Sequence, residues 1–206
     1  MNVLVFGATG KTGSLVVERA LAQGHQVTAL VRSATKITRP DVNVVVGDAT
    51  NPGDVLKAMD SQDAVIDTIG GTTPYKATQL ESDSIRSIIS GMKSKAVSRL
   101  IVVTMMGLGD SRAQAPWWYK HLLMTTFLRG STKDKTAVES EVRASGLRYV
   151  IVRPPILTET AATGTVKVIG PGATGHKISR ADLANFLVDQ LSDDRHIGQA
   201  VTVVNS

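Results

Sequence analysis

Three glycines near the start of the chain, Gly7, Gly10 and Gly13, have a spacing that suits phosphate binding. They follow an apolar run, Asn2–Phe6, and precede a segment in which apolar residues recur at helical spacing. A strand, a glycine turn and a helix in this order bind the pyrophosphate of a dinucleotide, because the backbone approaches closely and the helix N-terminus offers unpaired N–H groups. We therefore predict a dinucleotide site at this turn, completed by Thr9, Lys11 and Thr12.

Arg32 indicates which dinucleotide is bound. An acidic residue at the end of the second strand, about twenty residues past the turn, binds the free ribose hydroxyl of NAD, whereas a basic one binds the 2′-phosphate of NADP. The sequence has Arg32 at this place and no Asp or Glu beside it. NADP(H) is the predicted cofactor and NAD(H) the alternative, with Ser33 and Lys36 as further phosphate ligands. The simpler interpretation is that Arg32 is an exposed loop residue.

The elements that must position these residues alternate along the whole chain. Strand-like runs and helix-period segments in alternation are typical of a parallel sheet with helices on both faces. We predict an α/β fold, a doubly wound parallel sheet (Rossmann fold), as one domain over residues 1–206, with irregular substrate-side segments at 105–130 and 154–178. The predicted strands are 2–6, 26–31, 42–46, 64–68, 99–104 and 148–152, with edge pieces at 165–169 and 200–204; the predicted helices are 12–23, 52–59, 80–96, 132–145 and 180–191.

Composition narrows the class of protein. The chain has 206 residues, of which 42% are hydrophobic, and none of its apolar runs approaches the roughly 20 residues that a membrane-spanning helix needs. The first strand begins at Asn2, which leaves no room for a signal peptide, so we expect a cytoplasmic protein. There are no cysteines, which excludes disulfides and thiolate metal sites, and the four histidines show no ligand spacing, so we predict no metal site.

The net charge of +5 does not form a basic block. Lys and Arg are spread along the chain, and no nucleic-acid motif is present. We therefore expect a small-molecule substrate, with neither nucleic acid nor membrane as a partner, and a monomer or weak homodimer.

Sequence pieces along nearly the whole chain resemble the atypical short-chain dehydrogenase/reductases. Within that superfamily the sequence is most similar to the NmrA-like group, which includes the biliverdin reductase B-like flavin reductases. The pieces that carry the resemblance are the opening GATGKTG, Val45–Asp48, Asp63–Gly70, Leu100–Thr104, Asp134 with Lys135, Glu139, Ser145–Pro155 and Ile178–Asp182.

The resemblance implies a role for several residues of the site. Lys135 matches the family lysine that binds the nicotinamide ribose, although Lys135 and Glu139 are also spaced for a surface ion pair on one helix face. Asp48, with Ala49 beside it, would accept from the adenine amino group. The path from adenosine to nicotinamide would be bordered by Thr68, Ile69, Gly70, Thr104, Pro154, Pro155 and Ile156.

The usual proton donor of such reductases is missing. The family tyrosine four residues before the lysine is Ser131 here, a serine common in relatives after Thr104 is Met105, and Ile156 stands where the flavin reductases have a histidine. Hydride arrival at a carbonyl requires a proton on the oxygen, so the sequence disfavours carbonyl reduction by the usual triad. Lys135 and Thr104 are the remaining candidate catalytic residues.

An apolar floor of Met105, Met106 and Ile156 instead suits a planar acceptor such as FMN or another flavin, stacked on Trp117 and Trp118. Alternatively, the methionines only fill gaps and the tryptophans anchor an irregular segment. We predict NADPH-dependent reduction of a planar acceptor. The alternatives are a non-catalytic NADP(H)-binding redox sensor and, last, a sugar-nucleotide epimerase, which needs the missing tyrosine.

Overall fold

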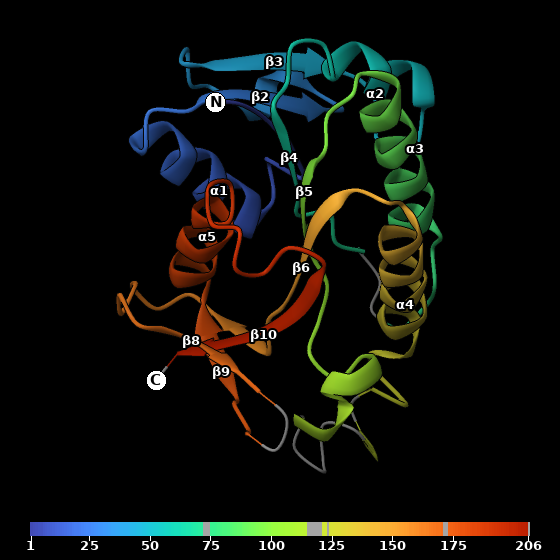
Figure 1. The fold of residues 1–206 in the computed structure, drawn as a ribbon, viewed down its shortest axis with the longest axis vertical. Coiled ribbons are helices and arrows are strands. Elements are labelled where there is room, and N and C mark those ends of the chain that lie inside the picture. Colours follow the sequence, from blue (N-terminus) through green and yellow to red (C-terminus); the bar gives the residue numbers. More distant parts are fainter. Residues whose placement is uncertain (72–74, 115–120, 123, 171–172, 206) are drawn as a thin grey trace.

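An eight-stranded sheet forms the centre of the molecule, and strands remote in sequence lie side by side in it (Figure 1). The computed structural model describes residues 1–71, 75–114, 121–122, 124–170 and 173–205. The strand order is β3-β2-β1-β4-β5-β6-β10-β8, and every neighbouring pair is parallel except β10 with β8. The strands are β1 (Asn2–Phe6), β2 (Gln26–Val31), β3 (Val42–Val46), β4 (Ala64–Asp67), β5 (Arg99–Val103), β6 (Arg148–Arg153), β8 (Val166–Ile169) and β10 (Gln199–Asn205).

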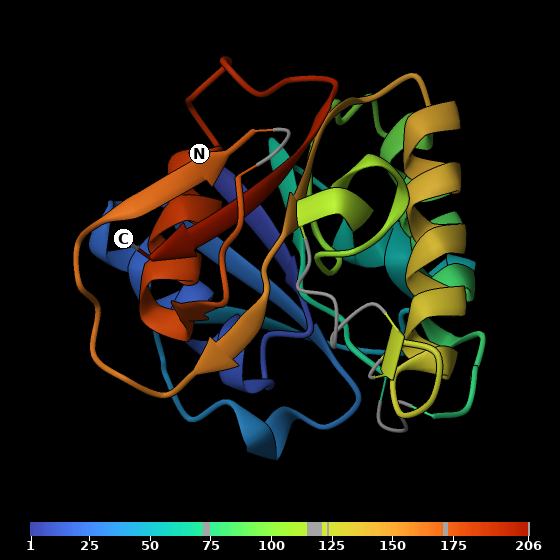
Figure 2. The same ribbon diagram turned by 90° about the horizontal axis from the view of Figure 1, so that it is seen from below.

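Helices cover both faces of the sheet because its inner strands are apolar on both faces. Along β1, Val3 and Val5 belong to one hydrophobic cluster, whereas Leu4 and Phe6 belong to another, and all four side chains are fully buried. The first cluster packs against α1 and α5, the second against α2, α3 and α4, and Figure 2 shows these two layers on opposite sides of the sheet. The helices are α1 (Lys11–Ala22), α2 (Pro52–Ala58), α3 (Leu80–Ser94), α4 (Arg129–Ala144) and α5 (Arg180–Asp189).

The doubly wound Rossmann fold is thereby confirmed. The chain runs outward from β1 through β2 to β3, then returns to β4 on the other side of β1 and continues outward through β5 and β6. The strand order reverses between β1 and β4, and in open α/β sheets ligands bind at the carboxyl ends of the strands beside such a switch point. The fold therefore directs attention to the loops after β1 and β4.

Local signals set the helix ends that the sequence predicted. Ser179 caps α5, since its Oγ accepts a hydrogen bond from the Asp182 N–H at 3.0 Å. Gly24 and Gly146 follow α1 and α4 and have φ values of +80° and +73°, in the left-handed region that glycine adopts without strain. Strand and helix bounds differ from the predicted ones by three residues or fewer.

The carboxyl-terminal part of the sheet differs from the prediction. The piece at 200–204 was expected at an edge, but β10 lies inside the sheet between β6 and β8, and β8 is the edge strand. The apolar alternation of β10 fits both positions, and its pairing partners are fixed only by tertiary packing. Two three-residue strands, β7 (Ile156–Thr158) and β9 (Lys177–Ser179), form a separate parallel pair that was not predicted.

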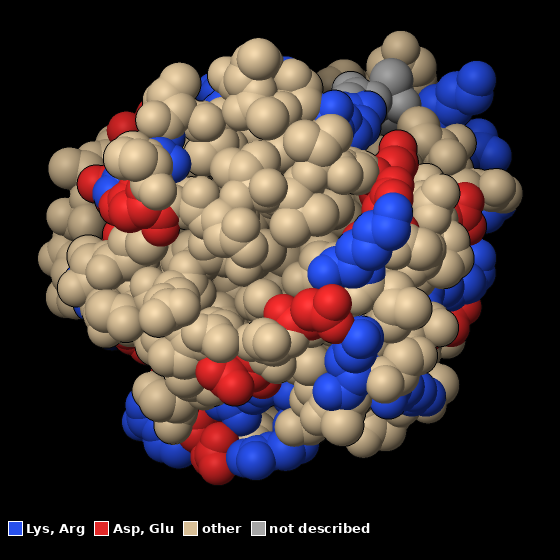
Figure 3. All heavy atoms as spheres, turned by 90° about the horizontal axis from the view of Figure 1, so that it is seen from above, with Lys and Arg blue, Asp and Glu red and all other residues tan. Residues whose placement is uncertain are grey.

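The surface carries both signs of charge. In Figure 3 basic and acidic side chains lie next to one another along the right side and at the rim of the face that is shown, and the middle of that face carries neither. Opposite charges placed side by side reduce the field that a surface projects. Among the helices of the described chain, none combines the length and the apolar character needed to cross a membrane.

Candidate cofactor and active site

The glycine turn after β1 is packed so tightly that only hydrogen atoms fit at two of its positions. The Gly10 N–H donates to the Gly7 carbonyl at 2.9 Å, and Gly7 has φ +75°. A Cβ added to Gly13 would overlap the Gly7 carbonyl and lie 2.8 Å from Thr68 Oγ1. Thr68 itself donates from Oγ1 to the Phe6 carbonyl at 2.8 Å, which ties the end of β4 to the turn. In the structure these glycines serve the tight turn and the close packing of α1 on the end of β4.

A cleft of about 250 Å³ opens above this turn at the carboxyl ends of β1 to β4. It brings together much of the predicted cofactor set and adds two residues of α3 that sequence reasoning missed, Leu80 and Ser84. The predicted residues that line it are Gly7, Thr9, Gly10, Arg32, Asp48, Ala49, Thr68, Ile69 and Gly70.

The other predicted phosphate ligands lie around this cleft. Lys11, Thr12 and Gly13 form the first turn of α1, which has no acidic residue and no side-chain cap of its own. Ser33 shares a hydrogen bond with Thr35 at 2.9 Å, and Lys36 is exposed at the end of a short 3-10 helix. An uncapped helix N-terminus beside cations favours an anion.

Asp48 lies in the cleft as a carboxylate. Its Oδ1 accepts from both the N–H and the Oγ1 of Thr50, each at 2.8 Å. These hydrogen bonds, against partial burial and helped by the Arg32 charge, lower the pKa of Asp48 below its usual value. At neutral pH Asp48 is therefore only an acceptor, as the predicted contact with the adenine amino group requires.

Lys135 is held at the side of the cleft by a buried carboxylate. Its Nζ donates to Glu81 Oε2 at 2.7 Å and to the Val103 carbonyl at 3.4 Å. Glu81 Oε1 in turn accepts from the Gly71 N–H at 2.7 Å, next to the cleft. The alternative of a surface pair between Lys135 and Glu139 is wrong, because both side chains are largely buried and have other partners.

The first turns of α4 fix the position of Lys135. Gly130 allows the loop before α3 to lie directly on the helix, since a Cβ there would come within 2.7 Å of the Ala77 nitrogen. Asp134 Oδ2 accepts from the Thr78 N–H at 2.9 Å. Together these contacts dock the loop against α4 and bring Glu81 to Lys135.

Glu139 belongs to a second buried network, centred on Arg153. The guanidinium donates to Glu139 from Nε at 2.8 Å and from Nη2 at 2.6 Å, and from Nη1 to Asp110 at 2.6 Å. Burial lowers the pKa of Arg153, but these hydrogen bonds outweigh that effect and raise it. Thr104 Oγ1 also donates to Glu139, at 2.9 Å. The hydroxyl proton of Thr104 is therefore committed to Glu139, which orients the residue at the end of β5.

The chain segments after β5 and β6 run side by side beyond the sheet. The Thr104 N–H donates to the Val152 carbonyl at 2.9 Å, and the Met106 N–H donates to the Pro154 carbonyl at 3.0 Å. Pro154 and Pro155 are buried, whereas Ile156 is 44% exposed. The structure thus brings the predicted nicotinamide-side residues Thr104 and Pro154 together.

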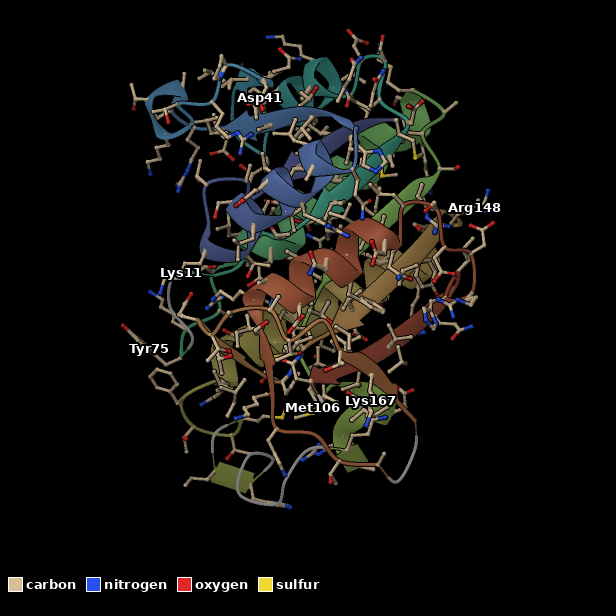
Figure 4. All side chains as sticks on the ribbon, turned by 90° about the vertical axis from the view of Figure 1, so that its left-hand side faces the viewer. Lys11, Asp41, Tyr75, Met106, Arg148 and Lys167 are labelled. Carbon is tan, nitrogen blue, oxygen red and sulfur yellow. The ribbon has the colours of Figure 1, made fainter. Side chains whose placement is uncertain are left out.

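The predicted substrate floor is only partly open. Met105 and Met106 are buried in a small cluster with Leu108 and Met124, and Figure 4 shows Met106 inside the lower part of the molecule. This packing is the gap-filling role that was the alternative for both methionines. Ser131, at the position of the family tyrosine, lies half-buried on α4 one turn before Lys135. Trp117 and Trp118 lie outside the described residues.

Asp67 is a buried acid that sequence reasoning missed. It ends β4, and its Oδ1 accepts from the Ile69 N–H at 2.9 Å. Burial raises the pKa of Asp67 to about 7, opposed by the Ile69 N–H and the Lys135 charge and assisted by the Glu81 charge. Asp67 therefore retains a proton well above the pH at which an exposed carboxyl loses it.

Asp67→Asn is expected to change how stability depends on pH. Between about pH 4 and pH 7 the native state binds a proton at Asp67 that the unfolded state has lost, so the wild-type free energy of unfolding falls as pH rises through this range. Asparagine keeps the acceptor for Ile69 and cannot titrate. Urea midpoints measured at pH 5 and pH 8 should show that the stability of the variant relative to the wild type is higher at pH 8 than at pH 5. A constant difference between the two proteins would contradict the raised pKa.

The buried partners Glu81, Asp67 and Arg153 carried weak signals in the sequence. Glu81 resembles an ordinary acidic residue in a first helical turn, and Asp67 and Arg153 end apolar strands. A charge that ends a buried parallel strand lies at the ligand-binding edge of the sheet, and this was the available signal.

Within the described chain, no group of three His, Cys, Asp or Glu side chains is arranged to hold a metal ion.

Comparison with known proteins agrees with this geometry. The uncharacterized protein YwnB of Bacillus subtilis (strain 168) is 28% identical over 222 residues, covering 100% of this chain and 99% of that protein. The structure of ChuY from Escherichia coli O157:H7, an anaerobillin reductase, has a TM-score of 0.83 at 29% identity, covering 100% of this chain and 97% of ChuY.

A third structure, a short-chain dehydrogenase/reductase of Veillonella parvula DSM 2008 in complex with NADP, shares the fold with a TM-score of 0.81 at 19% identity over 99% of this chain and 94% of that one. The profile of the NAD(P)H-binding family matches residues 7–194, from the glycine turn to beyond α5. The resemblance to atypical short-chain dehydrogenase/reductases is thereby confirmed, and this chain belongs to the NAD(P)H-binding family of Rossmann-fold proteins.

Proposed function

We propose that this protein is an NADPH-dependent oxidoreductase that reduces a planar acceptor such as a flavin or a bilin. The observation that carries the proposal is the buried setting of Lys135, which lies beside the cleft with no tyrosine one turn before it. The site has groups to hold and orient a nicotinamide ribose but lacks the acid that carbonyl reduction requires. The similarity to ChuY, an anaerobillin reductase, supports a planar acceptor.

The cleft fits the cofactor chemically. Gly7 and Gly10 line the cleft with backbone and no side chain, Arg32 is an exposed cation for the 2′-phosphate, and Asp48 is an ionised acceptor for the adenine amino group. When bound, NADPH would supply the hydride. An ammonium has three N–H donors, and two of those on Lys135 are used by Glu81 and the Val103 carbonyl, so one is available to a ribose hydroxyl.

The chain contributes orientation more than proton transfer in this proposal. Glu139 fixes Thr104, and Thr104 and Met106 are hydrogen-bonded to the backbone of the segment that ends in Pro154. These residues form a wall of fixed geometry, which favours hydride transfer by holding donor and acceptor together. An oxidised flavin accepts hydride at N5 and can take its later proton from solvent, so the missing tyrosine is no obstacle.

Arg32→Gln is expected to change cofactor preference. Loss of one charge-assisted contact with the 2′-phosphate should weaken NADPH binding by about 10- to 100-fold while NADH binding changes by less than about 2-fold. Fluorescence titration of both cofactors measures this. Arg148→Gln, an exposed arginine at the opposite ends of the strands, is the matched control. Equal losses for NADPH and NADH would place the 2′-phosphate elsewhere.

Absorbance at 340 nm during incubation with NADPH and a panel of FMN, riboflavin, biliverdin and quinones tests the reaction. The proposal expects steady NADPH oxidation with at least one planar acceptor and little with simple aldehydes or ketones. NADPH binding without oxidation by any member of the panel would contradict it. That outcome, with a co-purifying protein partner and similar affinity for NADPH and NADP⁺, would favour the redox sensor, which the missing tyrosine also supports.

A further inference from the structure

An acidic side chain from far along the sequence lies at the first turn of α1, the predicted phosphate-binding turn. Glu159, just after β7, has its Oε1 3.0 Å from Lys11 Nζ and 3.0 Å from Arg180 Nε. Arg180 also donates from Nη1 to Thr12 Oγ1 at 2.9 Å. One carboxylate oxygen thus lies between two cations at the glycine turn.

We propose that Arg180 is a further ligand of the cofactor pyrophosphate and that Glu159 occupies its guanidinium until the cofactor displaces it. The inference rests on the proposed NADP(H) site, since it assigns one more residue to the phosphates bound there. Neither residue belongs to the predicted cofactor set, and their contacts with Lys11 and Thr12 span 148 and 168 residues of the sequence.

The glycine turn has an excess of positive charge that residues of α1 itself do not neutralise. The first turn of α1 contains no Asp or Glu, and its N-cap, Gly10, has no side chain to accept from the free N–H groups. Lys11 and Arg180 add two positive charges, and the carboxylate that balances them in the described structure is Glu159. The two cations lower the pKa of Glu159, so it is ionised at neutral pH. A carboxylate and a phosphate are interchangeable partners for such a group.

The exposure of the three side chains makes an exchange inexpensive. Glu159 is 61% exposed and Lys11 is 72% exposed, so their ion pair is screened by water and weak. Figure 4 shows Lys11 at the margin of the molecule, where a ligand can reach it. Arg180 is only 21% exposed and is anchored to Thr12, so its guanidinium stays in place when Glu159 leaves. An arginine held in this way binds a pyrophosphate with less loss of side-chain freedom.

The distinguishing consequence is that Arg180 and Arg32 act on different phosphates. The pyrophosphate is common to NADPH and NADH, whereas the 2′-phosphate belongs to NADPH alone. Arg180→Gln should therefore weaken the binding of NADPH and of NADH by the same factor, about 10-fold or more, and Arg180→Lys should restore part of the lost affinity. Glu159→Gln should strengthen the binding of both cofactors by about 2- to 5-fold at low salt, and this gain in affinity should be smaller at high salt.

Fluorescence titrations of NADPH and NADH without any acceptor measure these effects, so they are independent of whether the protein turns over. Asp60→Asn is the matched control, because it removes a similarly exposed carboxylate from the ion pair with Lys95. Thermal melting checks that each variant is folded. Unchanged or weaker binding in Glu159→Gln would overturn the displacement, and a loss in Arg180→Gln confined to NADPH would overturn the pyrophosphate assignment.

Discussion

Replacing Gly13 by alanine is expected to abolish useful cofactor binding, with an affinity loss of about 100-fold or more. The added methyl group would overlap the Gly7 carbonyl and lie 2.8 Å from Thr68 Oγ1, which is itself hydrogen-bonded to Phe6. Both obstacles are fixed parts of the turn, so α1 must move away from β1. The N–H groups at the helix N-terminus would then no longer meet the pyrophosphate.

The measurement is a fluorescence titration with NADPH, accompanied by urea denaturation. Overpacking of this kind should also lower the free energy of unfolding by about 1–3 kcal/mol. Gly170→Ala is the matched control, because a Cβ at Gly170 meets nothing within 4 Å and the residue lies outside the cleft. A Gly13→Ala protein that binds NADPH as tightly as the wild type would show that the cofactor does not use this turn.

Arg153→Leu is expected to have the largest effect on stability, a loss of about 3–5 kcal/mol in the free energy of unfolding. The guanidinium is 1% exposed and makes two hydrogen bonds to Glu139, which is 8% exposed. Leucine would leave the buried carboxylate with only the half-exposed Arg143, at 3.8 Å, as a cation nearby. Thr104 would remain its hydrogen-bond donor, and one neutral donor cannot replace a bidentate cation.

Urea denaturation at pH 7 measures this loss. Arg148→Leu is the control, since Arg148 is 54% exposed in its ion pair with Asp194 and should cost about 1 kcal/mol or less. The double variant Glu139→Leu with Arg153→Leu should recover part of the stability, because it leaves no buried charge unpaired, and Asp110, the other partner of Arg153, is 79% exposed. If Arg153→Leu were as harmless as Arg148→Leu, the buried ion pair would not stabilise the fold.

Much of the fold could be predicted because its signals are local. Each inner strand is a short apolar run, each helix repeats at helical spacing, and Ser179 and Gly24 mark helix ends through backbone chemistry that one residue determines. The position of β10 could not be predicted in this way. Its sequence is apolar wherever it is placed, and its partners β6 and β8 are chosen by packing of the whole sheet.

In the candidate site, too, residues placed by local sequence could be predicted, and residues placed by tertiary contacts could not. The glycine turn, Arg32 and Asp48 could be found because each follows its own strand and the cleft is formed where those strands end. The partner of Lys135 could not, because Glu81 is 54 residues away and is brought in by a loop docked on Gly130 and Asp134. Spacing along one helix favoured Glu139 instead, but Glu139 is paired with Arg153, at the end of β6.

A crystal structure of the protein with NADPH tests the central claim most directly. The account predicts the pyrophosphate over the first turn of α1, the 2′-phosphate at Arg32, and the nicotinamide ribose within hydrogen-bond distance of Lys135 Nζ, with the ring beside Pro154. It also predicts that Glu159 has left Arg180. Density for NADPH in another cleft, or a nicotinamide remote from Lys135, would contradict the account.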